Sequence, residues 1–251
     1  MKSLVIANWK MNPATAREAK KLFEATRKAT EGAPHVSLVV APPPIFFSEI
    51  RKSYKGKKIA FAAQNARAEA GGAFTGEISL GEYKDAGASY VIVGHAERRA
   101  MGETNEDTGK KVAAALALKM TPVLCVGEMK RGAGGEHFEV VRAQLRAGFA
   151  GVEAPHTARV IVVYEPLWTI GADKAMSPRD MHEMAIFIRK SIVDLKGPVG
   201  MNIKILYGGS VDGNNAPDML KNGDVHGLLV GRASEDGIKL ASLLEAIEEA
   251  A

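Results

Sequence analysis

Eight short apolar segments, each followed by a stretch with helical periodicity, constrain the fold of this chain more than any other feature. The segments are rich in β-branched residues and are apolar at successive positions, a pattern typical of parallel strands that are buried on both faces. We predict strands at Leu4–Ala7, Val36–Ala41, Ile59–Ala63, Tyr90–Val93, Pro122–Val126, Val160–Tyr164, Ile203–Tyr207 and Gly227–Val230.

The stretches between these segments carry the signals with which helices begin. Thr104 precedes Glu106 and Asp107 in a first turn, and Ser177 precedes a first-turn proline, Pro178. We predict helices at Ala14–Thr30, Ile45–Ser53, Glu82–Ala86, Glu106–Leu118, Glu136–Ala147, Pro178–Leu195, Ala216–Lys221 and Ile238–Glu249. Eight βα units in 251 residues favour a closed (β/α)8 barrel. A doubly wound sheet is the alternative that the pattern leaves open.

Composition agrees with a single folded unit. Hydrophobic residues make up 46% of the chain and charged residues 25%, the ordinary balance of a globular protein. We find no segment of linker composition, so we predict one domain over residues 1–251. Every apolar run is shorter than the roughly 18 residues that span a membrane, and the one cysteine, Cys125, cannot form an intrachain disulfide. These features predict a cytoplasmic protein without a membrane partner.

The net charge of +4 raises the question of nucleic-acid binding. The densest basic stretch, residues 51–58, contains one arginine and four lysines but a single aromatic residue, Tyr54, and no recognisable binding motif. We therefore interpret these residues as a solvated surface and expect no nucleic-acid partner. The same positive charge can attract a small anionic substrate.

Reactive side chains gather directly after the predicted strands, at the mouth of a barrel where active sites lie. Lys10, His95 and Glu165 follow the first, fourth and sixth strands. Loops with small residues around Ser210 and Gly231 follow the seventh and eighth strands, and such loops expose backbone N–H groups that bind phosphate. The sequence therefore predicts a small phosphorylated ligand. It has no Walker-type loop, GxGxxG motif after a strand or zinc-ligand spacing, so we expect neither a metal nor an organic cofactor.

Five motifs at this mouth resemble those of the triosephosphate isomerase family. They are residues 8–12 (NWKMN), 93–99 (VGHAERR), 164–171 (YEPLWTIG), 207–211 (YGGSV) and 229–234 (LVGRAS). Residues 64–65 (QN) and 72–78 (GAFTGEI) resemble two further motifs of the family, and all occur in the family's order. The resemblance implies an enzyme that interconverts dihydroxyacetone phosphate and glyceraldehyde 3-phosphate through an enediol or enediolate, in glycolysis and gluconeogenesis.

The resemblance assigns catalytic roles to particular side chains. Glu165 matches the base that moves a proton between neighbouring carbons, and His95 matches the neutral imidazole that polarises the carbonyl group. Lys10 matches the cation that stabilises the developing negative charge. Glu97 resembles the acid beside that lysine, either as its ion-pair partner or as a proton-transfer group. Asn8 matches a polar group that holds the substrate.

The resemblance also implies a phosphate site and a lid. Backbone N–H groups would bind the phosphate at Gly171, Ser210, Gly231 and Arg232. Residues 166–176 would form the lid, whose principal residues are Pro166, Trp168, Ile170 and Gly171. In one state of the lid Trp168 would lie near Tyr164, and in the other near Glu128.

A second subunit follows from the same resemblance. Thr75, in the long loop from Asn65 to Ile78, matches the residue that enters the neighbouring subunit and supports Asn8, Lys10 and His95. The resemblance therefore implies a homodimer. Cys125 ends a strand close to the catalytic mouth, where we expect it to have a structural role.

Five positions depart from the family pattern. Ala96 replaces a serine whose hydroxyl can hold the base at rest, and residues 172–173 (AD) replace Thr-Gly at the lid tip. Met176 replaces a smaller alanine at a hinge that Tyr207 should contact. Arg232 stands where glycine is frequent, with its side chain expected in solvent. We predict that these changes shift the balance between open and closed lid without abolishing activity.

Three functions other than triose phosphate isomerisation are compatible with parts of the sequence. A related isomerase could act on a four-carbon phosphosugar, a distinction that depends on pocket length. A catalytically inactive dimer kept for binding would be favoured by loss of Lys10, His95 or Glu165, and all three are present. A nucleic-acid module would show strongly salt-dependent binding.

Overall fold

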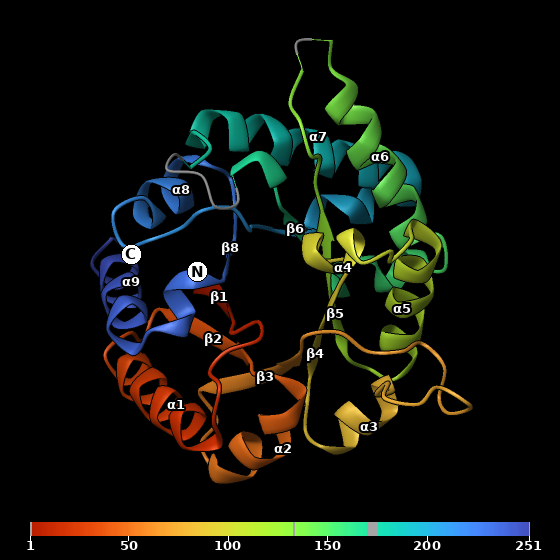
Figure 1. Cartoon of the computed structure of the whole chain (residues 1–251). Helices are drawn as coiled ribbons and strands as arrows, with labels where there is room; N and C mark the ends of the chain where they lie inside the picture. Colours follow the sequence, from red (N-terminus) through yellow and green to blue (C-terminus); the bar gives the residue numbers. More distant parts are fainter. Residues whose placement is uncertain (1, 133, 170–174, 251) are drawn as a thin grey trace.

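The computed structural model describes residues 2–132, 134–169 and 175–250, and eight parallel strands form a closed ring within it (Figure 1). Each strand pairs with the next along the chain, and β8 pairs with β1. The strands are β1 (Ser3–Asn8), β2 (Val36–Ala41), β3 (Ile59–Ala63), β4 (Tyr90–Val93), β5 (Thr121–Val126), β6 (Ile161–Tyr164), β7 (Lys204–Tyr207) and β8 (Gly227–Val230). The predicted (β/α)8 barrel is confirmed, and the doubly wound alternative is wrong because the sheet closes.

Helices surround the ring on its outer side (Figure 1). The α-helices are α1 (Ala16–Glu31), α2 (Pro44–Ser53), α3 (Leu80–Asp85), α4 (Ala96–Ala100), α5 (Asn105–Ala117), α6 (Glu136–Phe149), α7 (Pro178–Lys196), α8 (Ala216–Asn222) and α9 (Gly237–Glu249). The short 3-10 helices are η1 (Ala154–Arg159), η2 (Leu167–Thr169), η3 (Pro198–Asn202) and η4 (Arg232–Glu235).

Capping residues explain where the helices begin. Thr15 and Ser79 each form a capping box. The hydroxyl accepts a hydrogen bond from the backbone N–H of the glutamate three residues later, and the carboxylate of that glutamate accepts one from the backbone N–H of the capping residue. Helix α1 therefore begins at Ala16, two residues after the predicted start, and α3 begins at Leu80, two residues before it. Helix α4 was not predicted, because five residues are too few to show a helical period.

Two layers of apolar side chains hold the barrel together. Residues that alternate along each strand point into the ring, where Ile6, Ile92 and Val163 belong to one buried cluster. The residues between them, such as Val5 and Val162, pack outward against the helices in a larger cluster. Both faces of the strands are thus buried, as their continuous apolar sequence predicts.

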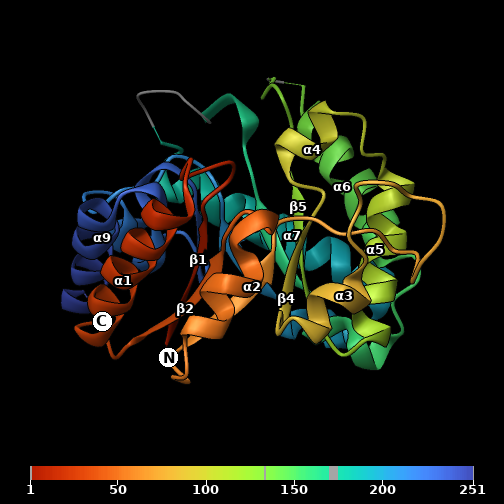
Figure 2. The same ribbon diagram turned by 60° about the horizontal axis from the view of Figure 1, so that its bottom comes forward.

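The carboxyl ends of the strands lie together at one end of the barrel. Figure 2 shows α4, which follows β4, at the upper rim of the ring and the N-terminus of the chain at the lower rim. Within the described ranges, no helix is both long enough and apolar enough to cross a membrane.

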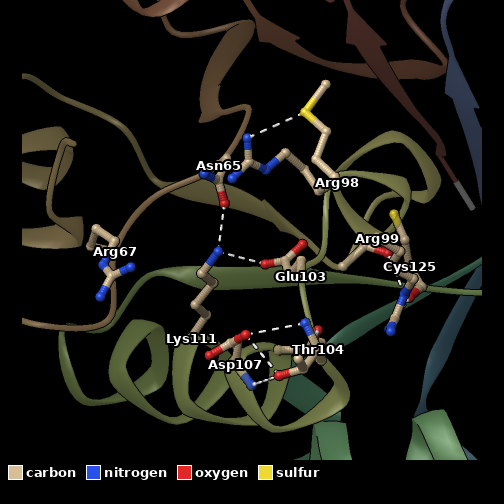
Figure 3. A network of polar contacts seen from close by, with 12 residues as sticks. Asn65, Arg67, Arg98, Arg99, Glu103, Thr104, Asp107, Lys111 and Cys125 are labelled. Atoms are coloured by element: carbon tan, nitrogen blue, oxygen red, sulfur yellow. Dashed lines mark hydrogen bonds and ion pairs between the residues drawn. The ribbon is translucent and has the colours of Figure 1, made fainter. Parts of the chain in front are cut away.

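A buried ion pair fastens the start of the long loop after β3. The Lys111 ammonium on α5 lies 2.5 Å from a carboxylate oxygen of Glu103 and donates to Asn65 Oδ1 at 2.8 Å (Figure 3). The Glu103 side chain is 2% exposed, and its other oxygen has no hydrogen-bond partner among the described residues. The carboxylate therefore depends on Lys111.

Replacing Lys111 with Met should lower the free energy of unfolding by about 3–5 kcal/mol, because the Glu103 carboxylate would stay buried without a partner. Urea denaturation at one fixed protein concentration measures this change. Lys110→Met removes the neighbouring lysine from an exposed pair with Glu106 and should leave stability nearly unchanged. Equal effects of the two substitutions would contradict the dependence of Glu103 on Lys111.

Candidate active site

One pocket at the carboxyl mouth of the barrel collects the residues that the sequence singles out. Asn8, Lys10, His95 and Glu165 line it together with the loops after β7 and β8. Those loops contribute Gly208, Gly209, Ser210, Val211, Leu229, Gly231 and Arg232. Strands distant in sequence therefore deliver a cation, an imidazole, a carboxylate and two small-residue loops to one place.

His95 lies at the N-terminal cap of α4 and is buried. Its Nδ1 accepts a hydrogen bond of 3.3 Å from the backbone N–H of Glu97. A ring nitrogen that accepts carries no proton, so the neutral ring holds its proton on Nε2. Nε2 lies 3.2 Å from Glu165 Oε1. The imidazole thus presents an N–H group to the centre of the pocket.

Glu165 directly follows β6, and 2% of it is exposed. Oε1 faces His95, and Oε2 accepts from the backbone N–H of Ala96 at 3.0 Å. The backbone amide of Ala96, a residue whose side chain has no hydroxyl, therefore holds the carboxylate. Below it, burial raises the pKa of the Cys125 thiol well above its ordinary value, and the charge of Glu165 adds to this effect. The expected location of Cys125 is confirmed.

Lys10 occupies a left-handed backbone conformation, with φ of 52°. Such a conformation costs a residue with a side chain about 1–3 kcal/mol, and hydrogen bonds offset it. The Lys10 N–H donates to Asn8 Oδ1 at 3.0 Å, and Gln64 Nε2 donates to the Lys10 carbonyl at 2.8 Å. The ammonium lies 2.6 Å from Glu97 Oε1. The predicted contact between Lys10 and Glu97 is present.

The loops after β7 and β8 form the other end of the pocket. Arg232 begins η4 and lines the same pocket as Ser210 and Gly231. Arg232 is exposed, as expected, and its guanidinium also donates to Ser210 Oγ at 3.2 Å. It adds a positive charge beside the small-residue loops.

Two glycines of this pocket adjoin catalytic groups. A Cβ at Gly208 would lie 2.9 Å from Glu165 Cγ and 2.7 Å from Val163 Cγ1. A Cβ at Gly231 would lie 3.0 Å from Lys10 Cε. Any larger residue at Gly208 would therefore displace the carboxylate.

The described part of the predicted lid is fastened at both ends. Trp168 Nε1 donates to Glu128 Oε1 at 2.8 Å, and the Tyr164 hydroxyl donates to the same oxygen at 2.7 Å. Burial and the charge of Glu128 raise the pKa of Tyr164. At the far end the Met176 N–H donates to the Tyr207 hydroxyl at 3.2 Å, the hinge contact that was expected. Of the two predicted positions of Trp168, the structure therefore shows the one near Glu128.

Some predicted site residues are not brought into the pocket. Pro166 follows Glu165, and its backbone carbonyl accepts a hydrogen bond of 2.9 Å from the Thr169 N–H. Ile170, Gly171 and residues 172–173 lie outside the described residues. Thr75 is exposed on the long loop after β3 and does not line the pocket of its own chain.

The sequence analysis did not identify several residues that shape the site. Gln64 donates to the carbonyls of both Lys10 and Ala41, and Ser234 Oγ donates to the Asn8 carbonyl at 3.1 Å. Both belong to motifs quoted above, so the sequence signal was present. The Ala96 N–H has no such signal, because every residue has a backbone amide.

Comparison with known proteins agrees with this geometry. The family model described as "Triosephosphate isomerase" matches residues 3–247. The chain belongs to the triosephosphate isomerase family. It is 40% identical to the triosephosphate isomerase of Endomicrobium trichonymphae over 97% of this chain and 98% of that one. It is 43% identical to that of Roseiflexus sp. (strain RS-1) over 92% of both chains, and 38% identical to that of Aquifex aeolicus (strain VF5) over 97% and 99%. The chain is therefore an isomerase of triose phosphates, and this isomerisation is a reaction of glycolysis.

Gly208→Ala should lower kcat about 10²-fold with a smaller change in KM, because it displaces the base more than the phosphate. Steady-state isomerisation kinetics measure both constants. Gly32→Ala is the control, since it lies at the end of α1 outside the pocket and a Cβ there would have only an ordinary contact of 3.7 Å with the Ala29 carbonyl. A Gly208→Ala enzyme as fast as the control would show that Glu165 tolerates displacement.

Proposed function

We propose that this chain interconverts dihydroxyacetone phosphate and glyceraldehyde 3-phosphate through the side chains of Glu165, His95 and Lys10. The observation that carries the proposal is the contact between the Glu165 carboxylate and the His95 Nε2–H, beside the pocket wall to which Lys10 belongs. A base, a neutral hydrogen-bond donor and a fixed cation are the groups that proton transfer next to a carbonyl requires.

In this proposal each of these side chains has a defined role in the proton transfer. Glu165 removes a proton from the carbon next to the carbonyl group and returns it to the neighbouring carbon. His95 Nε2–H donates to the carbonyl oxygen as negative charge develops there. The Lys10 ammonium stabilises that charge, and Glu97 holds the ammonium in place through its 2.6 Å ion pair. Asn8 contributes a polar side chain to the same wall.

Glu165 is at rest in this arrangement, because both carboxylate oxygens are bound by His95 and the Ala96 N–H. Substrate binding must release at least one of these contacts before the carboxylate reaches carbon. A backbone amide is fixed in α4, whereas a serine hydroxyl could rotate with the carboxylate. The Ala96 departure therefore alters how the base leaves its resting position.

The phosphate group binds at the opposite end of the pocket in this proposal. Ser210, Gly231 and Arg232 line the pocket there, and the backbone N–H groups at the start of η4 would bind the phosphate oxygens. The Arg232 guanidinium supplies charge that the usual glycine lacks. Gly171, with the lid residues Pro166, Trp168 and Ile170, completes the phosphate site when the lid closes.

We further propose that two copies form a homodimer in the cytoplasm, each copy being one catalytic domain over residues 1–251. A second opening of about 340 Å³ adjoins the catalytic groups and is lined by Lys10, His95 and Glu97. Exposed apolar side chains lie at its edge: Met11 is 92% exposed and Met101 is 74% exposed. A partner's Thr75 loop would cover this apolar edge and exclude water from the site.

Glu165→Gln should lower kcat roughly 10²- to 10⁴-fold, because the amide keeps the volume of the base but cannot accept the proton. A coupled assay of the purified protein with glyceraldehyde 3-phosphate measures the rate. Binding of the triose phosphate, followed by calorimetry, should change little, since the phosphate end is intact. Near-normal turnover of the variant would contradict the role of Glu165.

Thr75→Arg should convert the dimer into monomers and lower activity, because a bulky charge would be buried at the subunit contact. Sedimentation at several protein concentrations measures the assembly. Thr75→Ser, which keeps the hydroxyl, is the control and should stay dimeric. An unchanged dimer in the arginine variant would place the subunit contact elsewhere.

A further inference from the structure

The amino end of the barrel, opposite the active site, contains a second polar pocket. Its volume is about 230 Å³, far above the roughly 10–15 Å³ that one water molecule requires. Six polar side chains line it: Lys2, Ser37, Tyr90, Thr121, Arg159 and Lys204. They come from the amino ends of β2, β4, β5 and β7, from the residue before β1, and from η1.

Strand alternation explains why these side chains face the barrel axis. Leu4 and Ile6 of β1 point into the ring, as do Ile161 and Val163 of β6. Positions two residues earlier in the chain share the same face, which places Lys2 and Arg159 one layer below the apolar core. Tyr90 packs partly against that core from the same layer. The pocket is therefore closed at its inner end by buried apolar residues.

Three cations and three hydroxyl groups meet here without a counter-charge. No Asp or Glu is among the described residues that line the pocket. Lys2, Arg159 and Lys204 form no ion pair with any carboxylate in the described ranges. Positive charges around one opening repel each other, so an anion bound between them would stabilise the folded chain.

Two acidic groups at the same end of the barrel are engaged elsewhere. Glu248 on α9 interacts with Lys2 through space, but its oxygens bind the backbone N–H and the ring of His35. Asp224, whose charge acts on His226 as that of Lys204 does, lies 2.7 Å from the Arg189 guanidinium. These carboxylates therefore leave the cations of the pocket free to bind a ligand.

We propose that this pocket binds a compact polyanion of the phosphate class, such as pyrophosphate. Deprotonated phosphate oxygens accept hydrogen bonds and carry negative charge, which matches a wall of hydroxyl donors, ammonium groups and one guanidinium. The guanidinium of Arg159 can bind two phosphate oxygens at once, while Lys2 just before β1 and Lys204 at the start of β7 add positive charge. Three positive charges suit a ligand with more than one phosphoryl group.

Equilibrium dialysis with radiolabelled pyrophosphate tests the proposal. The buffer has low ionic strength, no divalent cation and saturating triose phosphates, so that the active site is occupied. One pyrophosphate per chain should remain bound. The triple variant Lys2→Gln/Arg159→Gln/Lys204→Gln should bind at least tenfold more weakly, and the double variant Lys2→Gln/Lys204→Gln should bind at least threefold more weakly.

The matched control Lys52→Gln/Lys57→Gln/Lys58→Gln removes the same charge from the exposed end of α2 and the loop that follows it, and should change the affinity less than twofold. All variants should keep kcat/KM for the triose phosphates within twofold, which shows that they fold. Equal weakening in both triple variants would overturn the proposal, since it would indicate general surface charge. Complete displacement of pyrophosphate by the triose phosphates would also overturn it, because it would place the anion in the active site.

Discussion

In a closed barrel each strand turns only one of its two faces toward the axis, and this constraint sets the chemistry of both ends. Side chains two residues apart share a face. Along β6, Ile161 and Val163 fill the interior, and Glu165 follows them at the carboxyl mouth. Along β1, Leu4 and Ile6 lead to Asn8 in the same way. A register shift of one residue would bury the carboxylate behind the helices.

Helix α4 supplies the second constraint. Its first backbone amides bind two different catalytic groups: the Glu97 N–H fixes the His95 ring, and the Ala96 N–H holds the Glu165 carboxylate. One turn of backbone therefore sets both the tautomer of the acid and the resting place of the base. Arg99 supports this turn by donating to the Gly94 carbonyl at 2.7 Å. The catalytic pair depends on backbone geometry as much as on side-chain identity.

The sequence predicted the barrel well because burial on both faces leaves a strong pattern. All strand bounds were predicted to within one residue, and all eight predicted helices to within two. The catalytic side chains were found from their place after the strands and from the family resemblance. Contacts made by backbone atoms, such as the Ala96 N–H, were missed because no residue type encodes them. The bond from Arg232 to Ser210 was missed for another reason, since it joins two loops whose separation depends on barrel closure.

The polar pocket at the amino end shows a further limit of sequence patterns. Lys2, Arg159 and Lys204 are far apart along the chain and appear as ordinary surface cations until closure brings them to one opening. The net charge of the chain was first considered as a sign of nucleic-acid binding and then as general surface charge. The structure instead shows that three of the positive charges line one pocket at the end of the barrel opposite the catalytic mouth.

The central claim is that α4 fixes His95 as a neutral ring with its proton on Nε2. Nitrogen-15 NMR of the histidine ring at pH 8, assigned with a His95→Gln variant, tests this directly. The account predicts a protonated Nε2 and an unprotonated Nδ1. A proton on Nδ1 would contradict it, because that nitrogen could not then accept from the Glu97 N–H, and Nε2 could not donate to the substrate.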